Sequence, residues 1–202
     1  MAIELILFDL GGVVVEVESD RLVHQVSQLL GRSFEDVQEI VYHKELLLPF
    51  ELGHISGPVY YEGLKRRLNL PWTYEQFAGA WNRIFIANRE VLQIMEQLAT
   101  QHKLMALTNT NALHLQHIKA TIPALSSFFH DWVASCDVGF RKPDPEIYRL
   151  ALKRGGVRPE SAVYIDDRPE LVEAGRRIGL HAIRFENSEQ LAMELRSCGV
   201  KL

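Results

Sequence analysis

Apolar residues follow two patterns along this chain. Some form short, nearly continuous runs, and others form stripes that recur every three or four positions. The first run, residues 3–8, has five apolar side chains among six, which is typical of a strand buried on both faces. Four later runs alternate with helical stripes, at residues 104–108, 132–135, 162–165 and 181–185. This alternation predicts an α/β fold, with a doubly wound parallel sheet and helices on both of its faces.

A block of helical stripes separates the first run from the second. Four residues carry helix-start signals in this block: Asp20, Ser33, Pro58 and Thr73. They predict four short amphipathic helices, and therefore a small bundle. We expect a sheet domain of residues 1–15 and 88–202, interrupted by a helical insertion at residues 16–87. Four aromatic residues are expected in the core of the insertion: Trp72, Phe77, Trp81 and Phe85.

The composition is that of an ordinary globular protein, with 202 residues, 47% of them hydrophobic and 24% charged. A net charge of −4 without a basic tract argues against nucleic acid or a membrane surface as a partner. Cys136 and Cys198 have no pairing motif, which favours a reducing compartment, and Cys136 is expected to be a packed thiol. No basic leader precedes the first run, and no segment reaches the roughly 18 apolar residues of a membrane span. These features predict a cytoplasmic protein.

Polar residues follow the predicted strands at the point where each strand ends. Asp9 follows the first run, Thr108 and Asn109 end the second, and Asp166 and Asp167 end the fourth. The carboxyl ends of parallel strands lie along one edge of a sheet, where ligands bind. We therefore expect Asp9, Asp166 and Asp167 to converge.

Three carboxylates brought together repel one another unless a cation lies among them. Hard oxygen ligands suit Mg²⁺, which keeps several waters and often bridges to a phosphate. Lys142 adds a fixed positive charge after the third predicted strand, and Thr108 and Asn109 supply a hydroxyl and an amide that can donate to phosphate oxygens. These residue types predict a site for magnesium and a phosphate group.

Four short motifs carry a resemblance to a known family. They are FDLGGV at residues 8–13, LTNTN at 107–111, GFRKP at 139–143 and YIDDRPE at 164–170. With these motifs in this order, the chain resembles the haloacid dehalogenase superfamily, whose members are mostly phosphatases that use an aspartate nucleophile and magnesium. The resemblance covers essentially the whole chain. It implies a Rossmann-like core, with the helical insertion as that superfamily's small helical cap.

The resemblance also implies roles for individual residues. Asp9 would be the nucleophile that forms an aspartyl phosphate, Thr108 would hold the phosphoryl group, and Lys142 would neutralise both. Asp167 would be the direct metal ligand, with Asp166 beside or behind it. The residues implied for the metal are Asp9, Gly11 through its backbone carbonyl, Asp166 and Asp167. Those implied for phosphate or substrate are Leu10, Gly11, Thr108, Asn109 and Lys142.

One position departs from the family pattern. Most phosphatases of this superfamily carry a second aspartate two residues after the nucleophile as general acid and base, a role worth roughly 10²–10⁴ in rate. Here that position is Gly11. Three explanations stay open: another proton donor, a substrate with a good leaving group, or binding without turnover. The candidate donors are Glu16, Glu18, His43 and His54, and the two histidines lie in a segment expected to face substrate.

Residues 50–56, with the sequence FELGHIS, bear on this choice. Some bacterial sugar-1-phosphatases of the superfamily have a similar string and also have glycine at the position of Gly11. This resemblance favours the second explanation, a good leaving group such as the anomeric oxygen of a sugar.

We therefore expect a magnesium-dependent phosphatase of a small phosphorylated metabolite, such as a hexose 1-phosphate, acting as a monomer or homodimer. The alternatives are a catalytically silent binding or regulatory protein and a metal-free 2-haloacid dehalogenase, which Asp166 and Asp167 disfavour. His114 and His117 have no evident acidic partner and are expected at the surface.

Overall fold

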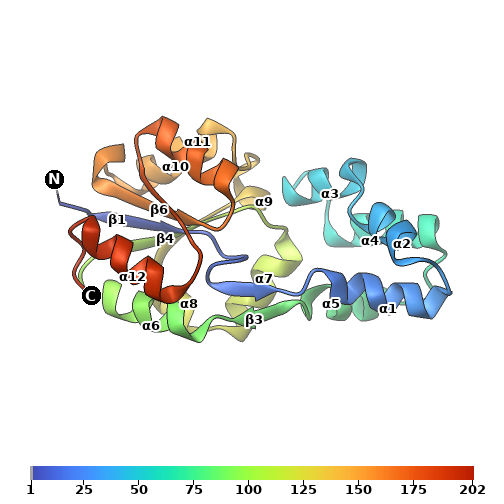
Figure 1. Ribbon diagram of the computed structural model, residues 1–202. Coiled ribbons are helices and arrows are strands. Elements are labelled where there is room, and N and C mark those ends of the chain that lie inside the picture. Colours follow the sequence, from blue (N-terminus) through green and yellow to red (C-terminus); the bar gives the residue numbers. More distant parts are fainter. Residues whose placement is uncertain (1) are drawn as a thin grey trace.

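A computed structural model describes residues 2–202 of the chain (Figure 1). Five parallel strands form one sheet in the order β5-β4-β1-β6-β7. They are β1 (Leu5–Phe8), β4 (Lys103–Thr108), β5 (Phe129–Ala134), β6 (Ala162–Asp166) and β7 (His181–Arg184). The chain moves outward from β1 to β5 and then crosses to the other side of β1 for β6 and β7. This order confirms the predicted doubly wound α/β fold.

Alternate side chains of each strand pack into two separate cores, one on each face of the sheet. In β1, Ile6 and Phe8 belong to one core, and Leu5 and Leu7 belong to the other. Figure 1 shows helices on both faces of the sheet. The first core is covered by α6 (Arg89–Leu98), α7 (Ala112–Thr121), α8 (Ala124–Phe128) and α12 (Ser188–Ser197). The second is covered by α10 (Pro145–Gly155) and α11 (Pro169–Ile178).

Two short elements complete this part of the chain. The helix α9 (Ser135–Val138) directly follows β5, and the 3₁₀ turn η1 (Pro159–Ser161) precedes β6. The sequence pattern placed Ser135 in a strand, whereas the strand ends one residue earlier. Within residues 2–202, every helix is too short or too polar to span a bilayer.

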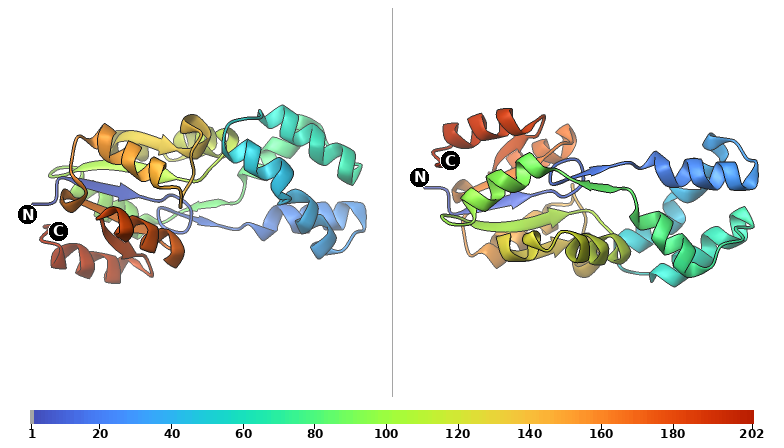
Figure 2. Two further views of the ribbon diagram at one scale, coloured as in Figure 1. Left: turned by 90° about the horizontal axis from the view of Figure 1, so that it is seen from above. Right: turned by 90° about the horizontal axis from the view of Figure 1, so that it is seen from below.

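Five helices form the insertion, one more than the sequence predicted. They are α1 (Asp20–Leu30), α2 (Phe34–Val41), α3 (Lys44–Glu51), α4 (Gly57–Leu68) and α5 (Tyr74–Asn82). The additional helix is α3, which has Pro49 in its last turn and consecutive leucines in place of a one-sided stripe. Figure 2 shows that the five helices lie beyond the carboxyl ends of the strands, away from the two termini. We call these helices the cap.

Aromatic side chains fill the interior of the cap. Phe50 stacks on Tyr60 with ring centroids 4.6 Å apart, and Trp81 lies 5.2 Å from Tyr60 and 5.6 Å from Phe77. Phe77 and Trp81 are buried as predicted, and Trp72 is partly buried against the same cluster. Phe85 is a correction, since it packs against the core of the sheet.

Two strands outside the main sheet connect it to the cap. They are β2 (Val15–Val17) and β3 (Phe85–Ala87), which pair antiparallel. The expectation of helical structure throughout residues 16–87 is therefore wrong at both ends of that range. A strand of three residues is too short for a two-residue alternation to be read from the sequence. The two crossing segments satisfy each other's backbone groups by pairing.

Candidate active site

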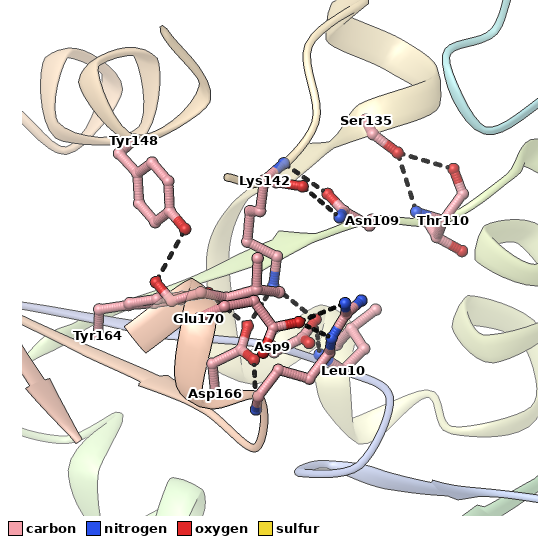
Figure 3. A network of polar contacts seen from close by, with 12 residues as sticks. Asp9, Leu10, Asn109, Thr110, Ser135, Lys142, Tyr148, Tyr164, Asp166 and Glu170 are labelled. Atoms are coloured by element: carbon pink, nitrogen blue, oxygen red, sulfur yellow. Dashed lines mark hydrogen bonds and ion pairs between the residues drawn. The ribbon is translucent and has the colours of Figure 1, made fainter. Parts of the chain in front are cut away.

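Asp9 lies directly after the central strand, at the carboxyl edge of the sheet (Figure 3). Its backbone N–H donates to the Ile165 carbonyl at 2.9 Å, which fixes the start of the turn. Its side chain is almost completely buried. The Leu10 N–H at 2.7 Å and the Lys142 ammonium at 3.1 Å both contact Oδ1. These contacts leave Oδ2 as the oxygen that can approach a substrate.

Lys142 is a buried cation with a side chain that is 0% exposed. Its ammonium donates to Asp166 Oδ2 at 2.6 Å and lies 3.1 Å from Asp9 Oδ1. The Asn109 side chain holds the lysine backbone from both sides, because its Oδ1 accepts from Lys142 N at 2.8 Å and its Nδ2 donates to the Lys142 carbonyl at 2.9 Å. A buried lysine without such partners would be strongly unfavourable. The predicted lysine is therefore fixed toward the predicted nucleophile.

Asp166 is held on both of its oxygens. Oδ1 accepts from the Arg168 backbone at 2.9 Å, and Oδ2 accepts from Lys142 and from the Tyr164 hydroxyl. Tyr164 is two residues earlier in β6 and so faces the same side of the sheet. Burial and the Asp166 charge raise the pKa of Tyr164, so this hydroxyl keeps its proton and donates. Asp166 thus orients Lys142 as well as adding negative charge.

Asp167 reaches the turn after β1. A Cβ on Gly12 would lie 2.4 Å from Asp167 Oδ2, and Gly12 has a φ of +79°. Only glycine combines this conformation with so close an approach. Burial and the Asp166 charge raise the pKa of Asp167.

The structure brings the three predicted carboxylates together. Asp9, Asp166 and Asp167 each offer an oxygen, and these oxygens lie within 4.8 Å of one another. If all three are ionised, Lys142 leaves the group with two net negative charges. Burial raises the pKa of Asp9 to about 6, although the Lys142 charge opposes this shift.

A divalent cation fits this charge and this all-oxygen donor set. Asp9 and Asp167 would each hold it with one carboxylate oxygen, and Asp166 lies beside them. The hydrogen bonds across the turn use Leu10 O and Gly12 N, which leaves the Gly11 carbonyl for the same cation.

A family model for haloacid dehalogenase-like hydrolases matches residues 3–179 of the chain. The chain belongs to this family. The match includes the strands that carry all four motifs, and it confirms the resemblance drawn from them. The protein is thus a member of a hydrolase family, with the sheet and cap that the motifs implied.

Two known proteins and one solved structure resemble this hydrolase over shares of its length that range from 39% to 96%. D-ribitol-5-phosphate phosphatase from Bacteroides thetaiotaomicron is 26% identical over 205 residues, which cover 96% of this chain and 97% of that protein. Flavin mononucleotide hydrolase 1 from Arabidopsis thaliana is 38% identical over only 78 residues, 39% of this chain and 32% of the relative. The structure of a family enzyme from B. thetaiotaomicron in complex with magnesium and inorganic phosphate has a TM-score of 0.84 at 21% identity, covering 92% of this chain and 95% of that one. This structural similarity shows the shared fold.

The hydrolase has a cleft of about 190 Å³ between the cap and the sheet. Its lining residues are Val17, Ser19, Leu22, Tyr42, Leu47, Glu51, Trp81, Ile84, Asn109, Thr110, Asn111 and His114. The volume is below the roughly 300–1,000 Å³ of pockets that hold drug-sized ligands. The cleft therefore suits a small group placed next to Asn109, at the sheet edge that carries Asp9.

The predicted proton donors do not line this cleft in the described part of the chain. His43 directly precedes α3, with its Nδ1 3.6 Å from Glu45 Oε2, and His54 is exposed in the turn after that helix. Glu16 and Glu18 are also exposed. The cap carboxylate that does line the cleft is Glu51, which lies in the same FELGHIS string as His54 but was not singled out from the sequence.

The remaining predicted substrate residues lie at the sheet edge. Thr108 is buried at the end of β4. The Leu10 N–H is used by Asp9, and the Asn109 side chain is used by Lys142, so neither group is free in this arrangement. Burial raises the pKa of the Cys136 thiol to about 12, so this thiol keeps its proton, as expected for a packed one.

His114 is not the surface residue that the sequence suggested. Its ring stacks on Trp81 of the cap with centroids 4.9 Å apart, and it packs edge-on against Phe85. Its ring nitrogens lie 3.1 Å from Asn111 Nδ2 and 3.1 Å from the Trp81 carbonyl. Burial lowers the pKa of His114 to about 3. This stacking could not be predicted from the sequence, since Trp81 is 33 residues away from His114.

Proposed function

We propose that this hydrolase is a magnesium-dependent phosphatase of a small phosphorylated metabolite, and that Asp9 is its nucleophile. The observation that carries the proposal is the group of three carboxylates within 4.8 Å of one another, with the buried Lys142 ammonium 3.1 Å from Asp9. The name of the B. thetaiotaomicron relative, a phosphatase of D-ribitol 5-phosphate, supports a phosphate ester as substrate. The complex of the related enzyme with magnesium and phosphate supports the cofactor.

The chain's own residues supply a two-step displacement. Asp9 Oδ2 attacks phosphorus while the bond from phosphorus to the leaving oxygen breaks, and an aspartyl phosphate forms. Lys142 holds a positive charge beside Asp9 and the phosphoryl oxygens, and Asn109 and Asp166 keep it in that position. A bound magnesium ion would neutralise charge on the phosphoryl group. Water then cleaves the aspartyl phosphate, which releases phosphate and restores Asp9.

Gly11 stands where most phosphatases of the family carry a general acid, and this limits how basic the leaving oxygen of the substrate can be. A Cβ on Gly11 would lie 3.2 Å from Val17 Cγ2, so β2 occupies the space beside it. A leaving oxygen of low basicity needs less help from an acid. We therefore propose a sugar phosphate as substrate, for which a hexose 1-phosphate with its anomeric leaving oxygen is the model compound.

The proposal is tested by phosphate release from a panel of sugar, alditol and nucleoside phosphates, with magnesium and with EDTA. Wild-type protein is expected to release phosphate only with the metal, and Asp9→Asn is expected to lose the activity. Asp36→Asn, an exposed aspartate in α2, is the matched control and should keep it. Turnover that survives EDTA or Asp9→Asn would contradict the mechanism. Binding of these phosphates without any turnover would favour a silent binding protein.

A further inference from the structure

The cleft between the cap and the sheet has one carboxylate among its described lining residues, that of Glu51. Its other polar groups are hydroxyls, amides and a histidine ring, and the rest of the lining is apolar or aromatic. An ionised carboxylate accepts hydrogen bonds and cannot donate one. Glu51 therefore introduces a directional requirement into a small pocket that is otherwise mostly defined by shape.

Glu51 is held firmly in place by the backbone around it. Its carbonyl accepts from the Ser135 hydroxyl at 2.7 Å, which ties the end of α3 to α9. Two residues later, a Cβ on Gly53 would lie 2.0 Å from the Cys136 carbonyl oxygen, and Gly53 has a φ of +71°. The chain can make this contact only because residue 53 is glycine. The side chain of Glu51 is thus presented from a fixed backbone.

The Glu51 carboxylate is paired with Arg141, in the motif that carries Lys142. Arg141 Nη2 lies 3.3 Å from Glu51 Oε2, and only 19% of the Glu51 side chain is exposed. The Nε of Arg141 is buried and has no hydrogen-bond partner within residues 2–202. A buried donor without a partner is costly, and the pairing of the same guanidinium with Glu51 offsets part of that cost. The Glu51 carboxylate, an acceptor, therefore lies next to the guanidinium of Arg141, whose Nε is a donor without a partner in residues 2–202. Arg141 directly precedes Lys142 in the chain.

We propose that Glu51 is a specificity-determining residue, which accepts a hydrogen bond from a hydroxyl of the leaving group while Arg141 holds its carboxylate in position. This inference rests on the proposed phosphatase function and adds the residue that recognises the hydroxyl groups of the leaving group. Glu51 is not suited to the phosphoryl group itself, because two anions repel each other. Burial raises the pKa of the Glu51 carboxyl, and the charges of Arg141 and Arg168 oppose this rise.

The inference predicts how two esters compare. Ribitol 5-phosphate and pentyl phosphate are both five-carbon primary esters and differ in their hydroxyl groups. A site that has a buried acceptor for a hydroxyl discriminates against the analogue that lacks it, because the acceptor is left unpaired. The wild type should therefore have the higher kcat/KM for ribitol 5-phosphate.

The decisive variant is Glu51→Gln, which keeps the size of the side chain and removes its charge. We expect kcat/KM for ribitol 5-phosphate to fall roughly 10–100-fold, mostly through KM, with little change for pentyl phosphate. Glu45→Gln is the matched control, since Glu45 is an exposed residue of the same helix and lies outside the cleft lining. It should leave both values unchanged. Thermal unfolding of each variant checks that it is folded.

Three outcomes overturn the inference. An equal loss on both esters would assign Glu51 to proton transfer or to general structure. An unchanged kcat/KM for ribitol 5-phosphate in Glu51→Gln would show that the carboxylate does not recognise the hydroxyls. A wild type that prefers pentyl phosphate would exclude a hydroxyl-binding cleft. By contrast, a wild type that hydrolyses no phosphate ester in the presence of magnesium would overturn the proposed function itself.

Discussion

Protonation of His114 should destabilise the folded protein below about pH 6. The ring lies at the contact between the cap and the sheet domain, stacked on Trp81 at an interplanar angle of 16°. Burial lowers its pKa to about 3, from an ordinary value of 6.5. The folded protein therefore keeps this histidine neutral at a pH at which the unfolded chain binds a proton.

The hydrogen bonds around the ring explain why the neutral form is retained. Asn111 Oδ1 accepts from the His114 backbone at 3.1 Å and from Trp81 Nε1 at 3.4 Å, which fixes the orientation of the Asn111 amide. Its Nδ2 then faces His114 Nδ1, so Nδ1 accepts and carries no proton. Nε2 donates to the Trp81 carbonyl. A proton on Nδ1 would oppose the amide donor and require Asn111 to turn away from both of its partners.

The sign and size of the effect follow from proton linkage. Between pH 6.5 and about 3 the unfolded chain binds a proton at this residue and the folded chain does not, so stability falls as the pH falls. The slope approaches about 1.4 kcal/mol per pH unit. Between pH 7.5 and pH 5 the free energy of unfolding should therefore drop by roughly 2 kcal/mol from His114 alone.

The assay is urea unfolding of wild type and of His114→Phe at a series of pH values. Buried carboxyls with raised pKa values, such as that of Asp9, make the folded protein more stable as the pH falls. Both proteins contain these carboxyls, so their effect cancels when the two free energies of unfolding are subtracted. The stability advantage of wild type over His114→Phe should shrink by about 2 kcal/mol on going from pH 7.5 to pH 5. His117→Phe, on the same helix, is the matched control for the loss of a histidine. Parallel stability curves, or an NMR spectrum with His114 doubly protonated at pH 5, would refute the reasoning.

Two further predictions concern the site itself. Gly12→Ala would place a Cβ 2.4 Å from Asp167 Oδ2 and should weaken magnesium binding at least about tenfold by calorimetry. Gly31→Ala, which also has a positive φ but open space around it, should bind the metal normally, and equal affinities in all three proteins would contradict the close-contact argument. Lys142→Met leaves buried carboxylates without their cation and should cost about 3–5 kcal/mol in urea unfolding at pH 7.5 without metal. A loss below about 1 kcal/mol there would mean that the lysine does not neutralise them.

The arrangement of the site could be predicted because it depends on topology more than on side-chain detail. Asp9, Thr108 and Asp166 each end a strand, and parallel strands place their carboxyl ends at one edge. Short motifs at strand ends therefore implied the convergence that the structure confirms. The fold class followed from the same alternation of strands and helices.

The cap contacts could not be predicted, because they join residues with no common sequence pattern. Glu51 meets Arg141 across 90 positions of the chain, and His114 meets Trp81 across 33. Apolar spacing shows which face of a helix is buried, but not which polar side chain on the edge of that face meets a partner. The sequence predicts His43 and His54 as substrate contacts because they are titratable groups of this segment, whereas the residue of the segment that lines the cleft is Glu51.

The contacts of the cap also explain how a small cleft can select its ligand. On one side His114 stacks on Trp81, and on the other Ser135 donates to the Glu51 carbonyl, so the cap is fixed at both ends of the opening. Under the proposed function, a leaving group that fits the existing space would keep both contacts and meet the Glu51 carboxylate, whereas a bulkier ester would have to separate the cap from the sheet. Selection by size and selection by hydroxyl groups therefore depend on the same fixed end of α3.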